Sequence, residues 1–287
     1  MPEPATTVTL LLSCPDQPGI VAATADFVYR HGGNIVHADQ HIDEETGVFF
    51  QRIEVDLDRF GLARDEIEPA LAEVEARFGM DVHVRFSDER PRVAVLVSRE
   101  AHCMYDLLAR WRGGELDSDI ALVASNHPDH VDAAEHFGVP YVHLPVTPST
   151  KAEQERQLVE LLEAHAIDLV VLARYMQILS PAFVARYPQR IINIHHSFLP
   201  AFIGSRPYHQ AHERGVKLVG VTAHYVTDEL DEGPIIDQDV ERVSHRDAVR
   251  DLIRKGRDLE KSVLARAVRA HLEHRILVYG NKTVVFD

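Results

Sequence analysis

Cysteine is scarce in this sequence of 287 residues. The only two cysteines, Cys14 and Cys103, lie far apart along the chain. Two cysteines can build neither a disulfide framework nor a cysteine-rich zinc site. We therefore expect a reducing compartment, the cytoplasm, for this protein.

Basic residues and long hydrophobic runs are scarce as well. There are 30 Lys and Arg against 45 Asp and Glu, which gives a formal net charge of -15 at pH 7. Nucleic acids and anionic membrane surfaces attract clusters of Lys and Arg, so we expect neither as a partner. The apolar run near the N-terminus is too short for a signal peptide or a membrane span.

The length and an ordinary hydrophobic fraction of 45% predict two globular domains, at about 150 residues per domain. Residues 1–86 have the order βαββαβ, in which a Gly-Gly pair at 32–33 ends the first helix. The polar segment 87–91 is the predicted linker. We expect strands at 7–13, 35–42, 48–55 and 80–86, and helices at 20–31 and 67–78.

Residues 92–287 have a different pattern, in which short apolar strands alternate with helices. Such a pattern predicts an α/β domain with a mostly parallel sheet that is covered on both faces. We expect strands at 93–97, 120–124, 141–144, 169–172, 191–194, 218–226 and 235–240, a long helix at 246–274, and a terminal hairpin at 275–287 that turns at Gly280-Asn281.

Polar side chains follow several of these strands, where open parallel sheets bind their ligands. Asn193 and His195 are two apart on an extended segment and point to the same side, and Asp231 belongs to a later loop. An amide can donate to the oxyanion of an attacked carbonyl, and an imidazole with a carboxylate can move a proton. This set predicts attack on a carbonyl carbon, with a satisfied core network as the alternative.

Several histidines near this set raise the possibility of a metal site. A metal-binding helix usually carries histidines at i and i+4 with a carboxylate nearby. Here His209 and His212 are three apart in a polar helix, so we expect no metal.

Three segments of the second domain resemble the 10-formyltetrahydrofolate-dependent formyltransferase family. They are Leu172–Pro181, Asn193–Pro200 and His224–Pro234. The resemblance implies a Rossmann-like catalytic domain in which Asn193, His195 and Asp231 are the catalytic set. It implies a folate pocket, and the predicted substrate-binding residues are Met176, Gln177, Ile178, Leu179, His196, Tyr225, Val226 and Asp228. His196 stands where the transferases usually have Pro, and it is either a ligand of the attacking water or an ordinary structural residue.

The segment Ser98–Cys103 departs from the ribonucleotide transferases, which have a Gly-rich phosphate loop here. It has no glycine, and Glu100 would repel a phosphate. The resemblance then implies hydrolysis of 10-formyltetrahydrofolate to formate and tetrahydrofolate, with no cofactor beyond the folate substrate. Formate would supply purine biosynthesis and balance one-carbon pools. The alternatives are formyl transfer to an unphosphorylated amine and a non-catalytic folate or amino-acid sensor.

The first domain resembles the ACT family, a ferredoxin-like regulatory fold. The segments Asp16–Ile20 and Gly33–Ile35 carry this resemblance. It implies glycine or methionine as effectors and a homo-oligomer, a dimer or a tetramer, that forms through paired copies. The possible effector-binding residues are Asp16, Gly19, Ile20 and Asn34. A purely structural pair of domains is the alternative.

Overall fold

A computed structural model of the chain describes residues 6–201 and 207–287. The chain divides into two compact units. The first contains residues 1–89 together with Glu273–Tyr279 and Val284–Asp287, and the second contains Arg90–Leu272 with Gly280–Thr283. The predicted second domain, 92–287, includes the C-terminal residues that the structure places in the first unit. None of the helices in the described ranges combines the length and the hydropathy needed to cross a membrane.

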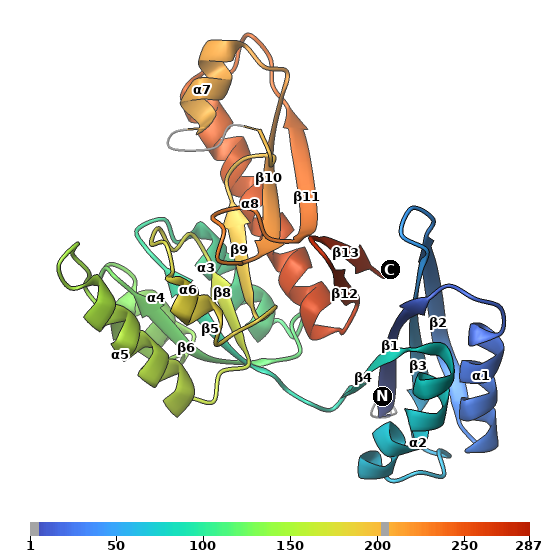
Figure 1. Ribbon diagram of the computed structural model, residues 1–287. Helices are drawn as coiled ribbons and strands as arrows, with labels where there is room; N and C mark the ends of the chain where they lie inside the picture. The colour runs from blue at the N-terminus through green and yellow to red at the C-terminus, as the bar shows by residue number, and fades with distance from the viewer. Residues whose placement is uncertain (1–5, 202–206) are drawn as a thin grey trace. The chain divides into compact units, whose positions relative to one another are not determined.

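The first unit has the predicted βαββαβ order, which confirms the expected fold (Figure 1). Its elements are β1 (Thr7–Pro15), α1 (Ile20–Arg30), β2 (Asn34–Asp43), β3 (Val48–Asp56), α2 (Arg64–Phe78) and β4 (Asp81–Phe86). The strands form one antiparallel sheet in the order β2-β3-β1-β4. The hydrophobic alternation of β1 and β3 directs their apolar side chains to the face on which both helices pack.

Gly33 shows how tightly α1 returns to the sheet. A Cβ atom at this position would lie 2.7 Å from the Phe60 ring and 2.8–2.9 Å from Val28 and Val55. Gly32 before it has a φ of 72°, in the left-handed region that suits a helix end. The predicted Gly-Gly signal therefore both ends α1 and lets β2 start close to the core.

The other face of this sheet packs against the C-terminal end of the chain. The hairpin of β12 (Ile276–Tyr279) and β13 (Lys282–Val285) was predicted, but its packing was not. Leu277 and Phe286 are buried with Leu11 and Phe50. The Tyr279 ring lies 4.6 Å from the Phe50 ring, and its hydroxyl donates to Asp43 at 2.7 Å.

The second unit is built on a seven-stranded sheet in the order β11-β10-β9-β8-β5-β6-β7 (Figure 1). Its elements are β5 (Arg92–Val97), α3 (His102–Arg112), β6 (Asp119–Ser125), α4 (Val131–His136), β7 (Tyr141–His143), α5 (Lys151–Ala164), β8 (Leu169–Leu172), α6 (Pro181–Val184), β9 (Ile191–His195), α7 (Pro207–Arg214), β10 (Leu218–Tyr225), β11 (Ile235–Arg242) and α8 (Val249–Leu272). The strands from β9 to β7 are parallel, and β10 and β11 add antiparallel partners. This arrangement confirms the predicted α/β class.

Two groups of helices pack against this sheet. One contains α5 and α6, and the other contains α8 and α3. Leu158 and Leu162 of α5 and Phe183 of α6 join one apolar core with residues of β5, β6 and β8. The long helix α8 packs along β9, β10 and β11 and also contacts α3. Because β8 and β9 are parallel, their carboxyl ends reach the same edge of the sheet, where Leu172 lies opposite Asn193.

We predict that Phe286→Ala destabilises the first unit by about 3–5 kcal/mol, because a buried aromatic ring is replaced by a cavity. Phe286 is 2% exposed, whereas its neighbour Val285 is 38% exposed and serves as the control. Hydrogen exchange of the β1 and β3 amides measures the effect. Unchanged protection in Phe286→Ala, or an equal loss in Val285→Ala, would contradict this packing.

Candidate active site

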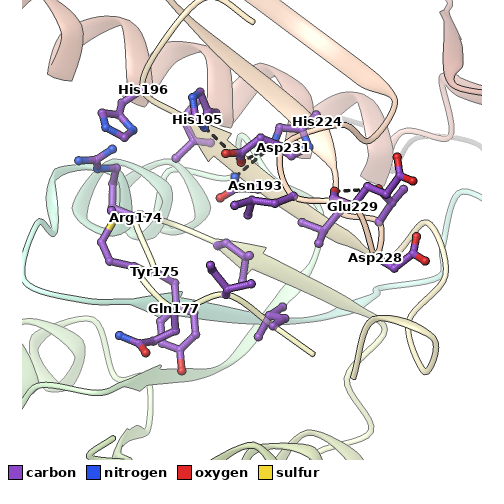
Figure 2. A pocket seen from close by; sticks show the side chains of 18 residues that line it. Arg174, Tyr175, Gln177, Asn193, His195, His196, His224, Asp228, Glu229 and Asp231 are labelled. Carbon is purple, nitrogen blue, oxygen red and sulfur yellow. Dashed lines mark hydrogen bonds and ion pairs between the residues drawn. The ribbon is translucent and has the colours of Figure 1, made fainter. Parts of the chain in front are cut away.

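Three predicted residues meet at the carboxyl end of β9. Asn193 and His195 are two apart on this strand and therefore lie on the same face of the sheet. Asp231 comes from the loop between β10 and β11. The His195 Nδ1 atom lies 3.2 Å from Asp231 Oδ1 (Figure 2). The imidazole is only 6% exposed, and the carboxylate is mostly buried. The structure thus brings the amide, the imidazole and the carboxylate together.

The loop that carries Asp231 is held in an unusual backbone conformation. Asp231 has a φ of 59°, in the left-handed region where aspartate is one of the tolerated residues. A Cβ atom at Gly233 would lie 1.8 Å from the Tyr225 carbonyl oxygen, so this position requires glycine. The Tyr225 N–H donates to the Pro234 carbonyl at 2.9 Å and closes the loop.

His224 orients the Asn193 amide. The His224 Nδ1 atom lies 2.9 Å from the Tyr225 carbonyl oxygen, which can only accept, so Nδ1 carries the proton. The other nitrogen, Nε2, then accepts from Asn193 Nδ2 at 3.2 Å. One N–H of the amide is used in this way, and the second is left for a ligand. The same Nε2 lies 3.7 Å from Asp231 Oδ1, too far for a hydrogen bond.

The His195 ring has one nitrogen that is available to a ligand. Its Nε2 atom is buried, and it lacks a hydrogen-bond partner among the described residues. A buried, unpaired nitrogen costs free energy unless a ligand satisfies it. Because Nδ1 donates to Asp231, Nε2 carries the lone pair of the ring. This lone pair can accept a proton.

Burial and nearby charges shift the pKa values of Asp231 and His196. Burial alone would raise the pKa of the Asp231 carboxyl, but the hydrogen bond from His195 holds that pKa below its usual range. Burial and the nearby positive charge of Arg174 lower the pKa of His196 to about 4. At neutral pH the site therefore contains an ionised Asp231 and a neutral His196.

A cavity of about 420 Å³ opens above these groups. Met176, Ile178 and Leu230 at its rim are each more than half exposed, and they give it an apolar edge. Of the predicted substrate-binding residues, those that line it are Met176, Gln177, Ile178, Leu179, His196, Val226 and Asp228. We call the part of the cavity that Met176, Ile178 and Leu230 line the apolar slot.

Tyr225 differs from the other predicted substrate-binding residues. In the described part of the chain its side chain does not line the cavity: it is 3% exposed, and its hydroxyl lies 2.7 Å from His271 Nδ1. Alternation along β10 turns it away from the cavity. Tyr225 contributes its carbonyl group instead, which fixes the tautomer of His224.

Arg174 and Glu260 are site residues that the sequence analysis missed. Arg174 lines the cavity and has a φ of 65°. Its Nε atom is 3.4 Å from Glu260 Oε2, and Glu260 is 1% exposed. The Glu260 carboxylate also accepts from Tyr208 at 2.8 Å and lies 2.8 Å from His102 Nε2. Arg174 follows a strand as site residues do, whereas a carboxylate on the inner face of a long helix gives no sequence signal.

One group among the described residues has the spacing of a metal site, namely His102, Cys103 and Glu260. It does not include the three predicted catalytic residues. Both Glu260 oxygens already have the hydrogen-bonding partners described above, and the Arg174 cation next to them opposes a second positive charge. Burial raises the pKa of the Cys103 thiol well above its usual value, which disfavours the thiolate that a metal needs.

The predicted effector residues do not form one cluster within the first unit. Gly19 and Ile20 stand at the start of α1, and Asp16 follows β1. Ile20 is 2% exposed and belongs to the core. Asn34 pairs with Asp56 at one end of the sheet, whereas the last residue of β1 pairs with the opposite end of β3. One copy of the first unit therefore does not bring the predicted effector residues together.

Comparisons with known proteins agree with both halves of this architecture. The sequence model of the Formyl transferase family matches residues 91–268, and that of the ACT domain matches residues 8–72. A formyltetrahydrofolate deformylase of Synechocystis sp. is 58% identical and covers 98% of each chain. The crystal structure of a formyltetrahydrofolate deformylase from Pseudomonas syringae is 50% identical, with a TM-score of 0.96 over 99% of this chain and 96% of its own. A glycinamide ribonucleotide transformylase from Symbiobacterium toebii is 34% identical, with a TM-score of 0.66 over 70% of this chain and 97% of its own.

We predict that the His196 ring titrates near pH 4, instead of near the ordinary histidine value of about 6.5. A pKa that is lower in the folded than in the unfolded state means that stability falls as the pH drops from about 6.5 towards about 4. Ring-nitrogen NMR measures the titration directly. Between pH 7 and pH 5, the wild type should lose more unfolding free energy than His196→Gln. An equal loss in the two proteins would contradict this assignment.

Proposed function

The chain belongs to the formyltetrahydrofolate deformylase family and hydrolyses 10-formyltetrahydrofolate to formate and tetrahydrofolate, and we propose that Asn193, His195 and Asp231 carry out this reaction. The observation that carries the proposal is the buried His195 Nε2 atom at the cavity, which has no hydrogen-bond partner in residues 6–201 and 207–287, with Asp231 on the other side of the ring. This geometry is that of a general base held by a carboxylate.

The folate would bind with its pterin in the apolar slot. Met176–Leu179 forms one wall of the cavity, and Val226–Asp231 forms the other. The formyl group would then lie over β9, because Asn193 and His195 are the polar residues of that strand in the cavity lining. The carbon of the formyl group would thereby reach both the proton acceptor and the amide donor.

Water then attacks the formyl carbon. His195 Nε2 takes a proton from the water, and Asp231 stabilises the imidazolium that results. The second N–H of the Asn193 amide donates to the oxyanion. Collapse of the tetrahedral intermediate breaks the carbon–nitrogen bond, and the proton on His195 passes to the leaving nitrogen. His224 keeps the amide in the donating orientation throughout.

These residues supply the base and the oxyanion donor without a metal, so we propose that activity needs none. Prolonged treatment with a chelator should leave formate release unchanged. The chemistry also requires no acceptor other than water. Steady formate release with folate as the sole substrate would distinguish hydrolysis from transfer to an unphosphorylated amine.

We further propose that the first unit binds an amino acid, glycine or methionine, and that it pairs with a second copy of the chain. The match to the ACT domain supports both statements, and so does the separation of Asn34 from Asp16 and Gly19 within one copy. Formate release with and without each amino acid tests regulation, and sedimentation tests the oligomer. We also propose that the protein acts in the cytoplasm and that the formate it releases supplies purine biosynthesis.

We predict that Asn193→Ala lowers kcat by about a hundredfold to a thousandfold, the usual cost of one lost oxyanion donor. Folate affinity should change little, because the apolar slot stays intact. Asn281→Ala, in the exposed turn of the C-terminal hairpin, is the matched control. Steady-state formate release gives kcat, and fluorescence titration gives the folate Kd. Wild-type turnover in Asn193→Ala would show that the amide has another role.

A further inference from the structure

His196 lies between two cavities of the second unit. The first is the catalytic cavity of about 420 Å³, and the second has a volume of about 380 Å³. Phe198, Leu218, Val219 and Val240 make the second cavity mainly apolar. Of the residues that the structure describes, His196 is the one that lines both. His196 therefore lies at the boundary of the two cavities.

Three side chains surround the His196 ring. Its ring centre lies 5.3 Å from the His195 ring and 6.3 Å from the Tyr208 ring. Figure 2 shows the Arg174 guanidinium next to it on the cavity side. The buried Glu260 carboxylate contacts both Tyr208 and Arg174, so one anion on α8 fixes both of these neighbours.

The backbone of α8 is shaped for this arrangement. A Cβ atom at Gly256 would lie 1.9 Å from the Tyr208 hydroxyl oxygen. Glycine inside a helix is less favourable than alanine, so the position needs a packing reason. The close approach of Tyr208 to α8, with its hydroxyl on Glu260, supplies that reason.

The ring of His196 suits water as its neighbour. The ring is neutral at neutral pH, so it offers one N–H and one lone pair. In the described ranges its nitrogens have no hydrogen-bond partner within the protein. A water molecule in the catalytic cavity can satisfy either nitrogen, and an ordered water typically needs two to four polar partners.

We propose that His196 determines the specificity of this site for water, because its side chain closes the second cavity to any larger nucleophile. The proposal rests on the proposed hydrolysis and deepens it. Without the side chain, the second cavity would open beside the catalytic trio. It could then take the apolar body of an amine whose nitrogen reaches the formyl carbon.

The two reactions differ in their proton balance. In hydrolysis a carbon–oxygen bond forms and the carbon–nitrogen bond of the folate breaks. Formate, tetrahydrofolate and one proton are released. With a neutral amine a new carbon–nitrogen bond forms instead. The proton that the amine loses goes to the folate nitrogen, so the products are a formamide and tetrahydrofolate with no net proton.

The test supplies the full-length protein with 10-formyltetrahydrofolate and an alkoxyamine, whose nitrogen is unprotonated at pH 7. O-methylhydroxylamine and O-benzylhydroxylamine are the two probes, and the N-formyl product and formate are both quantified. We expect the wild type to release formate with either probe. In His196→Ala the N-formyl product should appear, and the benzyl probe should exceed the methyl probe roughly tenfold or more, as a filled apolar pocket allows.

Three further variants distinguish the proposed steric role of His196 from other roles of this histidine. Phe198→Ala enlarges the second cavity without opening it to the trio, so it should release formate as the wild type does. His196→Leu keeps the bulk but not the ring nitrogens, so it should slow hydrolysis without producing the N-formyl product. His196→Ser replaces the alanine variant if that protein does not fold, as judged by circular dichroism.

The possible results are distinct. Folded His196→Ala and His196→Ser that release only formate at saturating probe would overturn the proposal, and so would equal transfer by Phe198→Ala. A wild type that releases no formate would instead overturn the proposed hydrolysis itself. Transfer confined to the alanine and serine variants, with preference for the benzyl probe, would support the role of His196.

Discussion

The contact between His195 and Asp231 is the interaction on which the rest of the site depends. It joins the end of a buried parallel strand to a loop that leaves the antiparallel extension of the same sheet. The loop reaches the strand only because Asp231 accepts a left-handed backbone and Gly233 leaves room for the Tyr225 carbonyl. That same carbonyl sets the tautomer of His224, which in turn orients Asn193. One closed turn thus aligns the three groups that attack on a carbonyl requires.

A second buried anion organises the opposite side of the cavity. Glu260 gathers Tyr208, His102 and Arg174 around one carboxylate in the interior. Removing any partner would leave a charge poorly paired in a low dielectric, so such a group holds its neighbours to one arrangement. The catalytic side is therefore fixed by Asp231, and the side toward His196 by Glu260.

Sequence reasoning succeeded where a signal is local. The βαββαβ order, the end of α1 at Gly32 and the terminal hairpin follow from hydrophobic period and turn chemistry, and the structure has them within a few residues. The convergence of Asn193, His195 and Asp231 was predicted from strand ends and from the family resemblance. The side-chain direction of Tyr225 was not, because the family resemblance assigned the whole segment to the pocket, whereas regular alternation along β10 turns Tyr225 away from the side on which His224 lies. The packing of Leu277 and Phe286 against Leu11 joins residues at opposite ends of the chain, and sequence distance hides such a contact.

The two folds, the family and the candidate catalytic residues can be predicted from the sequence alone. These features depend on residue type and on short-range spacing, which a single chain displays directly. The partners of those groups emerge only in the folded protein, because they come from segments that are distant in sequence. The tertiary structure showed that His195 Nε2 has no hydrogen-bond partner among the described residues, that Arg174 contacts the buried Glu260 beside the cavity, and that His196 lines both this cavity and a second one.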